Sequence, residues 1–307
     1  MADFDGKDTI ILSDEEVNEL NKGFCGNDLD HTGERMREAK ANQLQMELEV
    51  PENPWVNLPD TNGNYIAKGD EKILHKCNDE IREKGERNSK YKSSDYLFDL
   101  EILPEPFWGD IRNAEVFILS GNPGLGEDEK NFNQNETFKN VTLKNISLEK
   151  PKIVWLDQNF KKDIVFDGKP HPGFKYWEYR TRVLRKAVGN DNLNICIIEY
   201  FPYHSKKISS VMRDKGKDLP SCKFVDHYIK EAIKKEKWIV IARCKSDWLD
   251  RIEGLRDYKN KSKSVLLTSS QQMYLTPRNL VNKDELKNYE CPEDAPTWKK
   301  LVEACKN

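Results

Sequence analysis

Three short segments of this sequence combine residue types that can do chemistry, and each directly follows a run of apolar residues. The first is a glycine-rich turn with an asparagine at its apex. The second brings together a carboxylate, aromatic rings, a histidine and two lysines, and the third is rich in small hydroxyl residues. Amides position water, aromatic rings stack on bases, and lysines or backbone amides bind phosphate. The segments are residues 120–126, 199–207 and 268–279.

None of the three segments is a complete catalytic motif. Residues 120–126 (SGNPGLG) lack the Lys-Ser/Thr pair of a P-loop, the GxGxxG spacing of a dinucleotide-binding turn and the GxSxG of a nucleophile elbow. An Asn-Pro-Gly sequence also favours a turn by itself. A plain turn, a packed aromatic loop and an ordinary helix cap therefore stay open as alternatives for the three segments.

The apolar runs between these segments predict an α/β fold. Four short runs have the unbroken hydrophobic character of strands that are covered on both faces. Helical patterns alternate with the runs, which favours a parallel sheet, and ligands bind at the carboxyl ends of the strands in such sheets. The runs are 116–119, 195–198, 238–241 and 265–267, the helical patterns are 177–188, 224–233 and 248–255, and a further short strand is predicted at 153–156.

Composition and charge exclude several classes of protein. The 307 residues include 12 Phe, 11 Tyr and 7 Trp, so the chain can bury a core, and the net charge of −3 excludes a uniformly basic DNA-packaging protein. Residues 201–280 nevertheless hold 18 bases and 9 acids, which favours a polyanion-facing side in that half. No apolar run reaches 18 residues and no signal peptide is visible, so we expect a cytoplasmic monomer with no membrane partner.

Metal-binding patterns are not evident in the sequence. The seven cysteines contain no CxxC pair, and the five histidines contain no HxxxH pair. A structural zinc site and a zinc-hydrolase helix are therefore not expected. Reduced thiols fit the expected cytoplasmic location.

The amino-terminal third differs in character from the rest of the chain. It is polar, with helical patterns at 14–22, 33–48 and 70–86. We therefore predict two parts, a helical extension over residues 1–95 and an α/β domain over residues 96–307.

The first segment resembles a known family. Residues 117–125 (FILSGNPGL) are similar to the Gly-x-Asn-Pro-Gly-Leu first motif of the mismatch-specific branch of the uracil-DNA glycosylase superfamily, and the resemblance extends over roughly residues 100–285. It implies a three-layer α/β/α fold with a four-stranded parallel sheet in the order 2-1-3-4. It also implies hydrolysis of the N-glycosidic bond of a flipped base, leaving an abasic site, with no metal and no cofactor.

The resemblance also implies roles for individual residues. Asn122 would hold the attacking water, and Gly121, Pro123 and Gly124 would shape the base pocket. Gly124 replaces the aromatic residue that blocks the C5 edge in the uracil-strict branch, so the pocket would admit a C5 substituent. Residues 268–271 (TSSQ) depart from the His-Pro-Ser or Asn-Pro-Ser of the last motif, so the leaving base would be stabilised by Ser270, Gln271 or His204.

Base selection and DNA binding are assigned to further residues. Glu199 and Tyr203 are candidate base readers, and a carboxylate at Glu199 would favour the amino group of a cytosine-type edge. Because a modified cytosine fits this edge and the open C5 side, we predict a glycosylase for modified cytosine, such as that of phage DNA, or for mismatched uracil or thymine. The candidate DNA-binding cations are Lys206, Lys207 and Arg278, and the candidate wedge residues are Met273, Tyr274 and Leu275.

Two other functions stay open. The departure in the last motif is compatible with a non-catalytic module that binds nucleic acid or nucleotides on the same fold. A hydrolase of free nucleosides or nucleotides is the other alternative, and salt-dependent binding to DNA would count against it.

Overall fold

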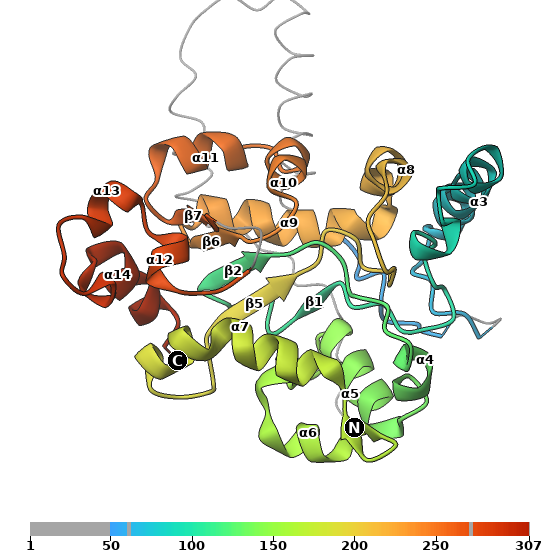
Figure 1. Cartoon of the computed structure of the whole chain (residues 1–307), viewed down its shortest axis with the longest axis horizontal. Coiled ribbons are helices and arrows are strands. Elements are labelled where there is room, and N and C mark those ends of the chain that lie inside the picture. Colours follow the sequence, from blue (N-terminus) through green and yellow to red (C-terminus); the bar gives the residue numbers. More distant parts are fainter. Residues whose placement is uncertain (1–49, 60–62, 270–272, 307) are drawn as a thin grey trace, which may run out of the picture. The chain divides into compact units, whose positions relative to one another are not determined.

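The computed structural model describes residues 50–59, 63–269 and 273–306, and the chain from Pro51 onward forms one compact unit around a central sheet (Figure 1). The α/β class is confirmed. The expected four-stranded parallel sheet is wrong as stated, because a fifth strand, β1, pairs antiparallel with β5 at the edge. The strands in spatial order are β1 Phe107–Trp108, β5 Ile195–Ile198, β2 Val116–Leu119, β6 Trp238–Ile241 and β7 Val265–Leu267.

The register of the parallel strands brings their carboxyl ends to one level. Leu119 of β2 lies opposite Ile198 of β5 on one side and Ile241 of β6 on the other. The residues that follow these strands therefore lie side by side at the carboxyl ends of the strands. The first two candidate segments are located there.

Helices cover both faces of the sheet, because alternate residues of every strand face opposite sides. One face packs on α9 (Pro220–Lys234), α10 (Lys245–Arg251) and α11 (Leu255–Lys261), and the other packs on α7 (Pro172–Val188) and α14 (Pro296–Ala304) (Figure 1). The remaining elements are α3 Glu71–Arg87, η1 Ser93–Asp95, α4 Glu129–Phe132, α5 Glu136–Ile146, η2 Val154–Leu156, α6 Gln158–Asp163, β3 Val165–Phe166, β4 Lys169–Pro170, α8 Ser210–Lys215, η3 Gly216–Asp218, α12 Pro277–Leu280, α13 Lys283–Leu286 and η4 Pro292–Asp294. None of the helices in the described ranges is long and apolar enough to cross a membrane.

Two of the predicted elements take a different form. The strand predicted at 153–156 is wrong, because these residues form the short helix η2, which buries Trp155 edge-on against Trp108 with ring centroids 5.1 Å apart. The helix predicted at 248–255 is divided into α10 and α11 at Gly254, which has a positive φ of 80°. The helices predicted at 14–22 and 33–48 lie outside the described residues.

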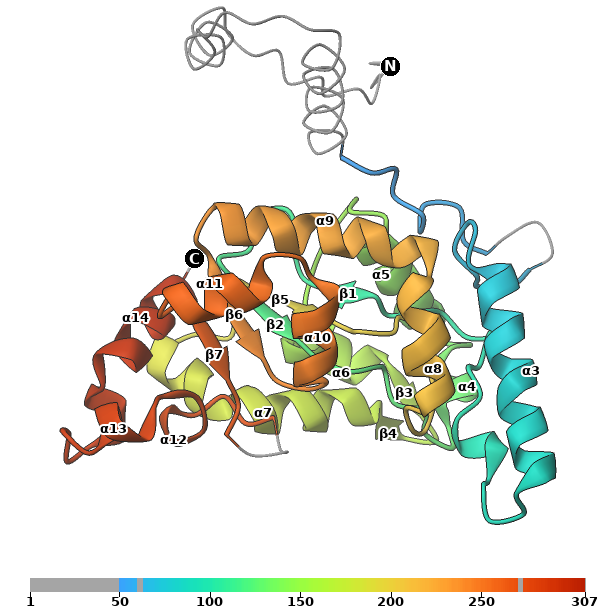
Figure 2. The same ribbon diagram turned by 90° about the horizontal axis from the view of Figure 1, so that it is seen from above.

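The described part of the predicted extension packs into the same core as the sheet. The predicted helix at 70–86 is α3, whose Leu74 and Ile81 are fully buried in one cluster with Ile198 of β5. Asp70, which precedes α3, accepts hydrogen bonds from the Tyr203 hydroxyl at 2.8 Å and from the Ser221 backbone at 3.0 Å. Figure 2 shows α3 beside α8 at one end of the sheet.

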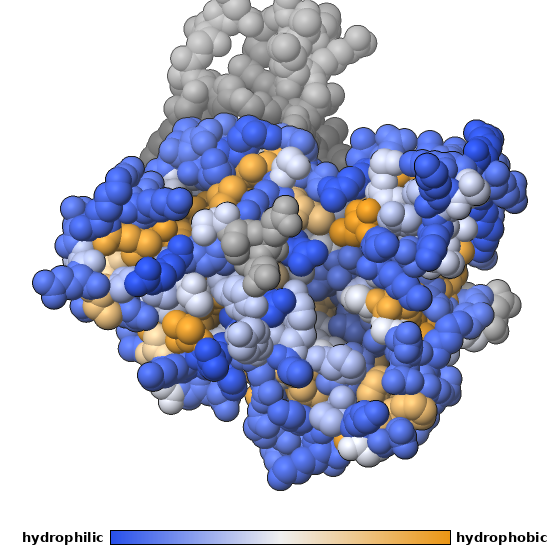
Figure 3. Space-filling view, in the orientation of Figure 1, coloured by the Kyte–Doolittle hydropathy of each residue, from blue (hydrophilic) through white to orange (hydrophobic). Residues whose placement is uncertain are grey.

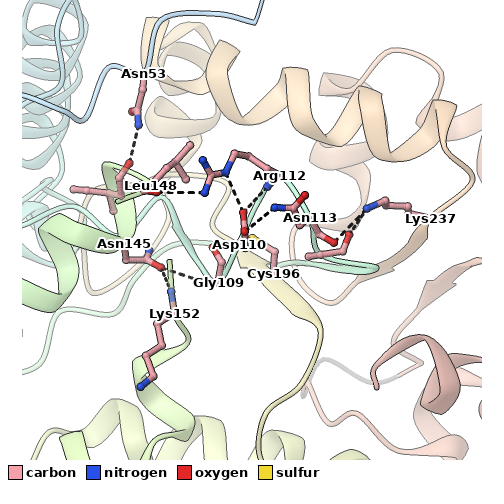
Figure 4. A network of polar contacts seen from close by, with 12 residues as sticks. Asn53, Gly109, Asp110, Arg112, Asn113, Asn145, Leu148, Lys152, Cys196 and Lys237 are labelled. Atoms are coloured by element: carbon pink, nitrogen blue, oxygen red, sulfur yellow. Dashed lines mark hydrogen bonds and ion pairs between the residues drawn. The ribbon is translucent and has the colours of Figure 1, made fainter. Parts of the chain in front are cut away.

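A polar network braces the opposite, amino-terminal end of the strands (Figure 4). Asp110 accepts hydrogen bonds from the Arg112 backbone at 3.1 Å and from the Asn113 side chain at 2.9 Å. Asn145 of α5 joins this turn to β1, because its amide donates to Phe107 O at 2.7 Å and accepts from Gly109 N at 3.2 Å. The network holds the edge strand β1 against the sheet.

Replacing Gly109 with Ala should destabilise the fold by more than about 3 kcal/mol. Gly109 has a φ of 100°, and a Cβ there would lie 2.5 Å from the carbonyl oxygen of Ile195. Gly168→Ala is the matched control, because its φ is also positive, at 69°, but its Cβ would meet nothing within 4 Å; it should cost about 1 kcal/mol. Urea unfolding measures both, and equal losses would contradict the importance of this close approach.

Candidate functional site

Backbone hydrogen bonds join three loops at the carboxyl ends of the parallel strands. Backbone hydrogen bonds run from Glu105 N to Pro202 O at 2.8 Å and from Phe201 N to Gly121 O at 2.9 Å. The space-filling view shows a hollow just to the right of the centre of the molecule (Figure 3). The loops are residues 103–106 before β1, 120–126 after β2 and 199–207 after β5.

The amide of Asn122 is held in one orientation. Its Nδ2 donates to Ser205 O at 3.0 Å, to Ser205 Oγ at 2.9 Å and to Pro123 O at 2.9 Å. Two of these acceptors are carbonyl oxygens, which accept only, so the nitrogen and not the oxygen must face them. Within the described residues Oδ1 has no partner, and it is the atom of Asn122 that remains available to hold a water molecule.

His204 is a buried cation, since its side chain is 3% exposed and both ring nitrogens face acceptors. Its Nδ1 donates to Gly124 O at 2.7 Å, and its Nε2 lies 3.4 Å from Glu105 Oε1. Burial alone would lower the pKa of His204, but the Glu105 carboxylate, the Glu129 charge and the Gly124 carbonyl outweigh it and raise the pKa to about 9. Glu105 is held in turn by Trp108, whose Nε1 donates to Oε2 at 2.7 Å.

A second buried pair lies behind the first. His171, the N-cap of α7, accepts a hydrogen bond from Gly173 N at its Nδ1, so its Nε2 carries the proton and donates to Glu129 Oε1 at 2.7 Å. Although burial opposes ionisation of Glu129, the hydrogen bond from His171 and the charge of His204 lower the pKa of this carboxyl below its ordinary value. Glu129 therefore adds negative charge near His204.

Glu199, by contrast, is a neutral acid at pH 7. The residue is 8% exposed, and desolvation raises the pKa of its carboxyl to about 8, against the lowering effect of a hydrogen bond with Ser120. Its Oε2 is buried and has no hydrogen-bond partner in the described part of the chain. A protonated carboxyl donates one hydrogen bond and accepts others, so it can pair with a ligand that offers both a donor and an acceptor.

The glycines of the first segment differ in the space around them. A Cβ at Gly124 would meet nothing within 4 Å, whereas one at Gly121 would touch Ile208, Cys244 and Arg243 at 3.4–3.7 Å. Pro123, between them, is buried. The loop is therefore open at Gly124 and closed at Gly121.

Glu105, Glu129 and His204 also have the composition of a metal site, because each offers a ligand atom and these atoms lie within 4.8 Å of one another. His204 Nε2 would have to lose its proton before it could bind an ion. With the proton in place, the imidazolium already compensates one of the two carboxylates.

Several predicted site residues lie elsewhere. Tyr203 is not a base reader, because its hydroxyl donates to Asp70 and its ring is fully buried. Met273 and Leu275 are buried in the core and cannot act as wedges, whereas Tyr274 is half-buried. Ser270 and Gln271 lie outside the described residues.

The three predicted DNA-binding cations are exposed but not equivalent. Lys206 lies near the end of the 199–207 loop, and no carboxylate lies within 4 Å of it among the described residues. Lys207 is paired with Asp95 at 2.7 Å, which compensates its charge. Arg278 lies on α12, where its charge acts on Glu293.

Sequence patterns missed three of the four residues in the two buried pairs, which are Glu105, Glu129 and His171. Glu105 precedes an edge strand of two residues, and Glu129 begins a helix of four residues, so neither stands out by periodicity. His171 has a local signal, because it precedes Pro172 and Gly173 at the start of a helix. Arg243, which follows β6 and is exposed, was also missed, although it occupies the same strand-end position as Gly121.

We compared the chain with models of protein families, with curated proteins and with solved structures, and none of them matches it. The interpretation of the site therefore depends on its own geometry.

Wild-type protein should become less stable as the pH rises, and replacing Glu199 with Gln should make this decrease in the free energy of unfolding smaller. In the folded protein Glu199 stays protonated up to a pKa of about 8, whereas in the unfolded chain it ionises near 4.5. The unfolded state therefore binds fewer protons in this window, and stability is lost as the pH rises through it, by up to about 1.4 kcal/mol per pH unit. Gln cannot ionise, so the variant should lose less.

Urea unfolding between about pH 5 and pH 8 measures this difference. His204, whose raised pKa also makes stability fall toward pH 9, remains in both proteins, so only the Glu199 contribution should disappear. Glu253→Gln, at a carboxylate that is 88% exposed, is the control. Parallel curves for wild type and Glu199→Gln would show that this carboxyl is ionised in the folded state.

Proposed function

We propose that this protein is a DNA glycosylase that hydrolyses the N-glycosidic bond of an extruded base. The observation that carries the proposal is the fixed amide of Asn122, which leaves Oδ1 available for water beside the buried cation His204. The order of the four parallel strands also supports it. They lie as β5-β2-β6-β7, which is 2-1-3-4 when these strands alone are numbered along the chain.

Asn122 acts by positioning the nucleophile. A water molecule that donates to Oδ1 is directed at C1′ of the sugar, while the amide stays neutral and does not remove a proton. The C1′–N bond breaks first in such a dissociative reaction, and its electron pair leaves with the base. Water then adds to the oxocarbenium-like sugar, and its proton passes to solvent.

His204 stabilises the departing base through its charge. Both of its N–H groups are engaged, by Gly124 O and by Glu105, so it has no proton to transfer to the base. A fixed positive charge in a buried site lowers the energy of an anionic leaving group without any reorganisation. This role matches the electrostatic role expected for His204 from the sequence.

Glu199 and Gly124 would select the base. The neutral carboxyl of Glu199 can accept from an exocyclic amino group and donate to the adjacent ring nitrogen of cytosine. Because nothing closes the space beside Gly124, a substituent at C5 of that base would fit there.

Cations near the site would bind the DNA backbone. Lys206 lies near the end of the 199–207 loop and Arg243 follows β6. Both are exposed, and neither has a carboxylate within 4 Å among the described residues. These two are better placed than Lys207, which Asp95 compensates. Each cation that contacts a phosphate contributes to a salt-dependent affinity that is the same for all sequences.

Replacing Asn122 with Ala should reduce base release by about 100-fold or more, because the water loses its acceptor. Asn122→Asp should also lose activity rather than gain it, since a carboxylate would face the carbonyl oxygens of Ser205 and Pro123. The assay measures abasic sites on duplex and single-stranded DNA that contains uracil, mismatched thymine, hydroxymethylcytosine or glucosylated hydroxymethylcytosine. Asn190→Ala, on an exposed turn, is the control.

Four outcomes separate the alternatives. Abasic sites on one substrate that disappear in Asn122→Ala would support the glycosylase and name its base. Undiminished release by Asn122→Ala would overturn the mechanism. No release from any substrate with DNA binding retained would favour a non-catalytic module, and activity on free nucleosides would favour the nucleoside hydrolase.

Replacing Gly124 with Phe should narrow the range of substrates without unfolding the protein. The backbone φ of Gly124 is not in the left-handed region, and a Cβ there meets nothing within 4 Å. The ring should occupy the space of a C5 substituent, so release of bulky C5-modified bases should fall by about 10-fold or more relative to the unmodified base. An equal loss on both classes would contradict the position assigned to the C5 edge. Val165→Phe, at a position of β3 that is 38% exposed, controls for the added ring.

A further inference from the structure

The outward face of α7 presents aromatic rings and cations together. Tyr176 and Tyr179 are 36% and 53% exposed, which is unusual for side chains of this size. Tyr274, from the segment between β7 and α12, lies against the same face. We call the five residues Tyr176, Tyr179, Arg180, Arg182 and Tyr274 the α7 platform.

The α7 platform is held in place by direct contacts. The Arg180 guanidinium lies 4.4 Å from the ring centroid of Tyr176 and 4.6 Å from that of Tyr274. Tyr274 also meets Tyr179 edge-to-face at 5.4 Å, and the Leu275 backbone donates to Arg180 O at 3.0 Å. Figure 2 shows the chain before α12 beside α7. The rings are therefore positioned before any ligand arrives.

The charge of this helix is uncompensated at the platform. α7 carries one acid, Glu178, which Lys161 of α6 already pairs at 2.8 Å. Arg180 and Arg182 have no carboxylate within 4 Å among the described residues, and neither does the neighbouring Lys175. A surface of exposed rings and unpaired cations complements a chain of phosphates and flat bases.

We propose that the α7 platform binds single-stranded nucleic acid by stacking bases on Tyr179 and its neighbours. This inference rests on the proposed function in one respect, because it makes the bound strand part of the substrate that enters the site. A single strand is favoured over a duplex, since only unstacked bases expose the faces that aromatic rings can cover.

The platform and the site share one helix. His171, the N-cap of α7, donates to Glu129 in the buried cluster, and Tyr179 lies eight residues further along. The separation along the helix axis is about 12 Å. A strand that lies on the platform can therefore continue to the carboxyl ends of β2 and β5 within a few nucleotides, and this path would guide a base toward Asn122.

Binding of an unmodified fluorescent oligothymidine, measured by anisotropy with the full chain, tests the inference without any base release. Tyr179→Ala should weaken binding of the single strand by about 10-fold, and Tyr179→Phe should retain it, because stacking needs the ring and not the hydroxyl. Arg182→Ala should reduce the slope of log affinity against log salt by about 0.7. Tyr289→Ala, at another tyrosine that is 36% exposed, is the matched control and should bind like wild type.

The same variants on a blunt duplex of equal length decide the class of ligand. A loss confined to the single strand supports the inference, and a loss confined to the duplex overturns it. Wild-type affinity in both Tyr179→Ala and Arg182→Ala also overturns it, provided that thermal unfolding shows both variants folded. These results are independent of abasic-site formation, so failure of the glycosylase proposal and failure of the platform can be told apart.

Discussion

The burial of a positively charged imidazole at the carboxyl ends of β2 and β5 is the constraint on which the rest of the site depends. A buried charge costs several kcal/mol unless it is paired and hydrogen-bonded. His204 meets this condition only because Glu105 and the Gly124 carbonyl reach its two nitrogens. Glu105 in turn needs the 103–106 segment to run beside the 199–207 loop, and that path is what adds β1 to the edge of the sheet.

The buried cation also explains why two nearby carboxyls ionise differently. Glu129 accepts a hydrogen bond from His171 and lies close enough to His204 for the charge to lower its pKa. The charge of His204 lowers the pKa of Glu199 only slightly, and the Glu105 charge raises it. Desolvation therefore dominates, and the carboxyl stays protonated at pH 7. Environments that drive apart the pKa values of like groups are typical of functional sites, where one group supplies charge and another supplies a proton for hydrogen bonding.

The sequence predicted the parallel strands well because a strand buried on both faces is an unbroken apolar run, as 116–119 and 195–198 are. It could not predict β1, since two residues between prolines and a glycine carry no periodic signal. The position of residues 120–126 and 199–207 after strands made Asn122, His204 and Glu199 candidate site residues. That position could not predict where each side chain points. Tyr203 shows the limit, because it lies between site residues and yet its hydroxyl reaches Asp70.

Asn122 is an amide and not a carboxylate. The proposed reaction therefore depends less on activation of the water and more on stabilisation of the departing base. Asn122 can direct a water molecule but cannot make it more basic, so any large lowering of the barrier must come from charge that favours departure of the base. The His204 cation acts in this sense where it lies closer to the departing base than the Glu105 and Glu129 carboxylates do, because those two charges oppose it. Because the space beside Gly124 is open, it would make few contacts with the C5 edge of a base. Selectivity must then come from hydrogen bonds to the pairing edge, where a wrong base would leave a polar group of the site unpaired.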